Sequence, residues 1–133
     1  MKKLIPLFLL AALTILPQAQ ANEETKSPIF LSNCSHYGPG VSYSFQSCVN
    51  SNFSAIDRVL GGFALNCMNI GKEVSYAFTS CVNANFRQVE LKLEGNVWLQ
   101  DCVNFDRTNL EYMFISCVNS NFKKIEREIS VNH

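Results

Sequence analysis

A motif of eleven residues recurs three times along the chain, each time around a cysteine. It reads Tyr-x-Phe-x-Ser-Cys-Val-Asn-x-Asn-Phe over residues 43–53, 76–86 and 112–122. A second cysteine lies upstream of each copy, and successive copies are 33 and 36 residues apart. A period of this size is typical of one supersecondary unit copied in tandem. The sequence therefore predicts three units, at about residues 29–62, 63–97 and 98–133.

The apolar residues of each copy are spaced as on one face of a helix. In the first copy, Phe45, Val49, Phe53 and Ile56 fall at steps of three and four, which is the spacing of an amphipathic helix. A half-buried strand would alternate apolar and polar residues, and the adjacent pair Cys48 and Val49 breaks that alternation. The pattern predicts an all-α fold. Its helices are expected to begin near Val41, Lys72 and Thr108.

Glycines stand where two of the expected helices would continue. Gly61 and Gly62 in the first copy align with Gly95 in the second, and an interior glycine costs a helix about 1 kcal/mol relative to alanine. The favoured interpretation has long helices that reach towards Cys67 and Cys102, packed as an antiparallel three-helix bundle because the connectors are short. The alternative is an array of shorter helical hairpins.

The six cysteines indicate a disulfide framework. An even number of cysteines in a small exported protein is typical of structural disulfides rather than of metal ligands. If each unit closes on itself, the pairs are Cys34 with Cys48, Cys67 with Cys81, and Cys102 with Cys117. Loops of this size contribute about 3 kcal/mol each in the chain-entropy model. We expect no metal site and no cofactor.

The first residues have the features of a secretory signal. Two lysines precede the apolar stretch from Leu4 to Leu16, and Ala19-Gln20-Ala21 has the small residues of a cleavage site. We expect residues 1–21 to be removed and residues 22–133 to form a single helical repeat domain. The style of the signal is bacterial, so the predicted location is the periplasm or the medium. No segment after the signal has the roughly 20 apolar residues of a membrane span, and the absence of any Lys and Arg cluster argues against a nucleic-acid partner.

Two sets of repeated asparagines call for an explanation. Asn52, Asn85 and Asn121 fall on the apolar face, where an amide is costly to bury without partners. The favoured interpretation is that each amide binds backbone groups at a neighbouring turn. The alternative is a polar lining of a small internal pocket.

A second stripe on each helix pairs a tyrosine with an asparagine two turns later. The pairs are Tyr43 with Asn50, Tyr76 with Asn83, and Tyr112 with Asn119. One interpretation makes these stripes the seams between neighbouring units. The other makes them candidate contact residues for a partner, because tyrosine combines a large apolar area with a hydroxyl.

The sequence offers little for catalysis. Asp57, Glu90 and Glu126 align across the copies, but they read as ordinary helix-surface charges. The chain has two histidines, of which His36 lies near Cys34, a cysteine that a disulfide would occupy. The first hypothesis is therefore a non-enzymatic binding module of the cell envelope that contacts an unknown protein partner. The second is a carrier of a small apolar ligand, and the third is a small envelope hydrolase that uses the aligned carboxylates.

Overall fold

The computed structural model describes residues 28–38, 40–106 and 108–132, so the expected signal at residues 1–21 lies outside the described residues. The chain forms three helices: α1 (Tyr43–Leu60), α2 (Tyr76–Lys92) and α3 (Tyr112–Asn132). Within the described ranges, the one β feature is an isolated bridge between Gly40 and Asn109. The predicted all-α fold of three helical units is confirmed.

Each helix begins at the tyrosine of its motif, two to four residues later than expected. The Ser42 side chain accepts the N–H of Phe45, and the Ser75 side chain accepts the N–H of Phe78. A serine in this position satisfies a backbone donor that the helix itself leaves unpaired. The residues before each serine belong to a connector rather than to the helix.

The helices end at the glycine sites, so the predicted long helices are wrong. Gly61 follows α1 with a φ of +82° and its N–H bonds to the carbonyl of Asp57. This left-handed conformation strains any residue with a Cβ and is common just past a helix end. Gly95 follows the end of α2 with a φ of +74°. Gly61 therefore ends α1, and α2 ends just before the left-handed pair Glu94 and Gly95, so the upstream cysteines lie in non-helical chain.

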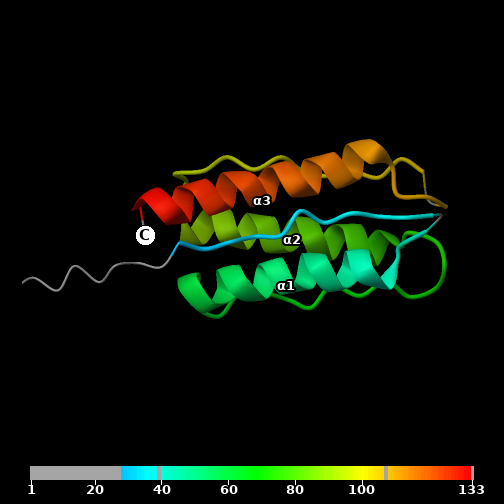
Figure 1. Ribbon diagram of the computed structural model, residues 1–133, viewed down its shortest axis with the longest axis horizontal. Helices are drawn as coiled ribbons and strands as arrows, with labels where there is room; N and C mark the ends of the chain where they lie inside the picture. Colours follow the sequence, from blue (N-terminus) through cyan, green and yellow to red (C-terminus); the bar gives the residue numbers. More distant parts are fainter. Residues whose placement is uncertain (1–27, 39, 107, 133) are drawn as a thin grey trace, which may run out of the picture.

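Three extended segments carry these upstream cysteines. We call residues 28–36 segment 1, residues 62–69 segment 2 and residues 97–104 segment 3. Figure 1 shows them running alongside the helices. Segment 2 runs back along α1, since Asp57 binds the N–H of Ala64 and Asn50 binds the N–H of Cys67.

The three helices are parallel, which corrects the antiparallel arrangement predicted from short connectors. Segment 2 returns the chain to the end at which α1 began, so α2 starts there again. Equivalent rings then meet: Phe45 lies 6.3 Å from Phe78, and Phe53 lies 5.0 Å from Phe86. The true connection between successive helices is a turn, an extended return segment and a second turn.

The core is built from matching layers that each helix supplies once. Phe53, Phe86 and Phe122 are buried and form a triangle with ring centroids 5.0, 5.1 and 5.2 Å apart. Their interplanar angles of 60° to 65° give the edge-to-face contacts that aromatic rings favour. Since α1 contacts α2, α2 contacts α3 and α3 contacts α1, the units form a closed ring rather than an open array.

The predicted disulfides are confirmed. The pairs are Cys34–Cys48, Cys67–Cys81 and Cys102–Cys117, with Cα atoms 5.6, 5.5 and 5.6 Å apart. Each disulfide fastens a segment to the helix that follows it in the chain. Three such bonds in one small domain indicate an oxidising, extracellular environment. Within the described ranges, no helix combines the length and apolar character that crossing a membrane requires.

The connectors close the core at the end where the helices begin. Gly40 is buried there and has a φ of +77°. A Cβ on Gly40 would stand 1.9 Å from the carbonyl oxygen of Lys72 in the next connector. The bridge from Gly40 to Asn109 reaches the third connector. A residue without a side chain is therefore required where the three connectors meet.

Candidate functional site

The asparagines of the apolar face each hold the segment of their own unit. Asn85 accepts the N–H of Leu65 at 2.9 Å through Oδ1 and donates to its carbonyl at 2.8 Å through Nδ2. Asn52 and Asn121 do the same for the backbone of Ser32 and Gln100. Each amide thus binds backbone, as in the favoured interpretation of the sequence, although that backbone belongs to an extended segment rather than to a turn.

The asparagines of the outer stripe hold the segment of the next unit. Asn50 binds both backbone groups of Cys67, and Asn83 binds both backbone groups of Cys102. Asn119 does the same for Cys34, which closes the ring. We call these contacts seam 1/2 (α1 with segment 2), seam 2/3 (α2 with segment 3) and seam 3/1 (α3 with segment 1).

The aligned carboxylates reinforce the same seams. Asp57 accepts the N–H groups of Phe63 and Ala64 at 2.5 and 2.9 Å. The hydrogen bond from Ala64, followed by that from Phe63, lowers the pKa of Asp57 below its ordinary value of 3.8. Glu90 accepts the N–H of Leu99 at 2.5 Å, and Glu126 accepts that of Leu31 at 2.6 Å.

His36 ties a connector to the start of its helix. Its Nδ1 lies 3.3 Å from the hydroxyl of Ser42, and its Nε2 contacts the carbonyl of Gly38. Asn69 occupies the equivalent place in the second unit and accepts the N–H of Ser75 at 2.7 Å. In the part of the chain that the structure describes, no three His, Cys, Asp or Glu side chains gather as a metal ion would need.

The three motif tyrosines are different, because the fold makes little use of them. Tyr43, Tyr76 and Tyr112 are 85%, 87% and 82% exposed. Among the described residues, their hydroxyl groups make no hydrogen bond. Because the helices are parallel and each begins at its tyrosine, all three side chains lie at one end of the molecule.

Three more exposed apolar residues, at equivalent positions of the three units, lie at this end and were not singled out from the sequence. They stand three residues after each upstream cysteine: Tyr37, Ile70 and Phe105. Their shared apolar character at an equivalent position was the available signal, although their identities differ. Together the six residues form what we call the aromatic rim: Tyr37, Tyr43, Ile70, Tyr76, Phe105 and Tyr112.

Comparison with protein-family models, with curated proteins and with solved structures finds no match.

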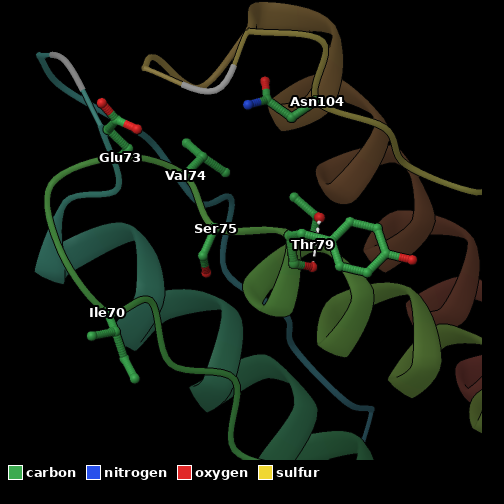
Figure 2. A pocket seen from close by; sticks show the side chains of 7 residues that line it. Ile70, Glu73, Val74, Ser75, Thr79 and Asn104 are labelled. Carbon is green, nitrogen blue, oxygen red and sulfur yellow. Dashed lines mark hydrogen bonds between the residues drawn. The ribbon is translucent and has the colours of Figure 1, made fainter.

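Grooves lie at the aromatic rim, along seam 2/3 and along seam 3/1. A groove of about 490 Å³ lies where α2 meets the connectors, and Figure 2 shows Thr79 on its helical wall with Asn104 across from it. A second groove, of about 540 Å³, follows seam 3/1 past Tyr112, Ser116 and Lys123. Seam 1/2 is bridged instead, because Gln46 reaches across it and accepts the N–H of Asn69 at 2.9 Å.

Proposed function

We propose that this chain is a non-enzymatic, exported binding module of the cell envelope that contacts a protein partner through its aromatic rim. The observation that carries the proposal is the exposure of large apolar side chains at equivalent positions of all three units, at one end of the molecule. Exposed apolar groups gathered on one surface are typical of interaction sites. Tyrosine is enriched in such sites because it adds a polar hydroxyl to a rigid apolar ring.

The contrast with the other repeated residues supports this proposal. Each repeated asparagine and each aligned carboxylate has a defined structural partner. The tyrosines of the motif have none among the described residues. Their repetition therefore needs a reason outside the fold, and contact with another protein supplies one.

The polar residues that suggested the two alternative functions have structural partners in the fold. An apolar-ligand carrier was suggested by the ten phenylalanines and by asparagines on an apolar face, and those amides bind backbone. A hydrolase was suggested by aligned carboxylates, and Asp57, Glu90 and Glu126 are engaged by backbone N–H groups of the next segment. A carboxylate that positions a segment in this way is poorly placed to exchange protons with a substrate.

Affinity capture from an envelope extract tests the proposal. The exported protein is compared with a variant carrying Tyr43→Ser, Tyr76→Ser and Tyr112→Ser. A matched control replaces three exposed apolar residues outside the rim: Val59→Ser, Leu91→Ser and Val131→Ser. We expect a partner that the control retains and the rim variant loses, followed by direct binding of the purified partner in calorimetry with at least a tenfold weaker affinity for the rim variant.

Circular dichroism of both variants verifies that the helices are intact. The proposal fails if the extract yields no partner, or if the rim variant binds the purified partner as tightly as the unchanged protein does.

A further inference from the structure

The three seams are equivalent in backbone geometry but differ in what fills them. In seam 1/2 the Gln46 side chain accepts the N–H of Asn69. In seam 2/3 the Arg87 Nη2 lies 3.4 Å from Oδ1 of Asp101, which is the one ion pair in the described part of the chain. Seam 1/2 and seam 2/3 thus each contain one additional acceptor, at different positions: the Gln46 amide and the Asp101 carboxylate.

Seam 3/1 has neither of these acceptors. Ile115 stands at the position of Gln46, and Asn33 stands at the position of Asp101. Lys123 takes the place of Arg87 and is exposed. The N–H of His36 corresponds to the N–H of Asn69 and, like that of Asn104 in seam 2/3, bonds to no acceptor within the described ranges.

The groove at seam 3/1 is consequently rich in donors. It is lined by Lys123 and by the hydroxyls of Tyr112, Ser116 and Ser120, and no carboxylate lines it. The next acidic residue along α3, Glu126, already accepts the N–H of Leu31 at 2.6 Å. A charged ammonium without a nearby counter-charge attracts a carboxylate, which gains both Coulomb energy and a charge-assisted hydrogen bond.

The dimensions of the groove suit an extended peptide. Ile115 and Lys123 are eight residues apart on α3, a separation of about 12 Å at 1.5 Å per residue. About four residues of extended chain cover this distance at 3.3 Å per residue. The opposite wall is lined by four residues of segment 1: Asn33, Cys34, Ser35 and His36.

We propose that the groove at seam 3/1 binds an extended acidic segment of a protein partner. A carboxylate of the segment pairs with Lys123, in the place that Asp101 takes in seam 2/3. A carbonyl or side-chain oxygen four residues away accepts the N–H of His36, in the place of the Gln46 amide in seam 1/2. This inference rests on the proposed function in naming a protein as the partner, and the site lies apart from the rim residues of α1 and α2.

Titration of a defined peptide into the ¹⁵N-labelled exported protein tests the inference. The probe is an acetylated, amidated hexapeptide of alternating Glu and Val, and the comparison peptide has Lys in place of Glu. We expect saturable amide shifts that centre on His36, Ser116 and Lys123, with at least tenfold weaker binding of the Lys peptide. Absence of saturable shifts, or equal binding of both peptides, overturns the inference.

Two variants supply the missing acceptors from within the chain. Ile115→Gln places a glutamine where seam 1/2 has one, and Asn33→Asp places a carboxylate beside Lys123. We expect each substitution to lower the affinity for the Glu peptide at least tenfold, because the new side chain competes with the peptide for its donor. Thr79→Gln makes the same change in seam 2/3 and should leave the affinity unchanged. Undiminished binding to both variants shows that the groove is not the site.

A variant with two of the three tyrosine substitutions, Tyr43→Ser and Tyr76→Ser, distinguishes this inference from the proposed function, because Tyr112 lines the groove. This double variant should still bind the Glu peptide and should show weaker partner capture. If the peptide fails to bind while capture depends on the rim, the acidic segment is wrong and the binding module stands. If no partner is captured but the Glu peptide binds as described, the peptide-binding groove is supported and the role of the rim is not.

Discussion

Asn119 Oδ1 accepts the backbone N–H of Cys34 at 2.7 Å, and Asn119 Nδ2 donates to the carbonyl of the same residue at 2.8 Å. The two residues are 85 positions apart in the chain. Asn50 and Asn83 make the same pair of bonds to the cysteine of their next unit. The last helix is thus joined to the first segment by the contact that joins consecutive units, and the ring has no free end.

Loss of one buried asparagine should destabilise the protein by about 2 to 4 kcal/mol. Asn121 is fully buried and satisfies both backbone groups of Gln100. Asn121→Ala leaves these two groups unpaired and also opens a small cavity. Urea denaturation with the disulfides intact measures the change in unfolding free energy. Asn66→Ala is the control, because Asn66 is exposed; an equal cost for both variants would contradict the structural role of Asn121.

The aromatic triangle should be the most sensitive part of the core. Phe122 contacts Phe53 and Phe86 with ring centroids 5.1 and 5.2 Å away. We expect Phe122→Ala to cost about 3 to 5 kcal/mol, as large-to-small changes of buried aromatics do. Thermal unfolding followed by circular dichroism measures the effect. Phe105→Ala, at an exposed position, should change stability by less than about 0.5 kcal/mol. Similar losses of stability for Phe122→Ala and Phe105→Ala would contradict the importance of the triangle.

Stability should fall in acid partly through Asp57. Backbone N–H groups of Ala64 and Phe63 lower the pKa of Asp57 in the folded protein from the ordinary value of 3.8. A lowered folded pKa gives stability that is complete above about 3.8 and is lost as pH falls through the folded pKa. Urea midpoints between pH 6 and pH 2 should therefore fall less for Asp57→Asn than for the unchanged protein. If the urea midpoints of the two proteins fall equally with pH, the hydrogen bonds do not lower the pKa of Asp57.

A circular permutant should fold, because the three seams are equivalent. The permutant begins at Gly62, joins residue 132 to residue 28 through about six glycine and serine residues, and ends at Gly61. A flexible linker of this length costs little loop entropy, so we expect an unfolding free energy within about 1 kcal/mol of the original. A permutant opened between Asn83 and Ala84, inside α2, is the control and should lose its cooperative transition. Failure of the first permutant would show that seam 1/2 does not hold without its covalent connection, and therefore that the seams are not equivalent.

Much of the fold could be predicted from the sequence because it depends on local patterns. The apolar spacing around Phe45 and Phe53 indicates a helix wherever it packs. The repeat makes pairing within each unit the consistent choice, and Cys34–Cys48 follows from it. The buried position of Asn85 is a matter of helical periodicity, and its use of backbone as a partner follows from the cost of burying an amide.

The direction of the helices could not be predicted from these patterns. It depends on the residues after Gly61, which have no periodic signature and run back along α1. Nothing local to Asn50 indicates that its partner is the backbone of Cys67 rather than another protein. The rim residue Ile70 was overlooked because its counterparts in the other two units are Tyr37 and Phe105. The three units carry three different residue types at this position, so a search for identical residues does not find it.

The closed ring is tested most directly by nuclear Overhauser contacts among the three ring systems of Phe53, Phe86 and Phe122 in the isotope-labelled protein. The centroid distances of 5.0, 5.1 and 5.2 Å place protons of every pair within range. We predict cross-peaks for all three pairs. An open array of units would give contacts from Phe53 to Phe86 and from Phe86 to Phe122, and the absence of a contact between Phe53 and Phe122 would contradict the closed ring.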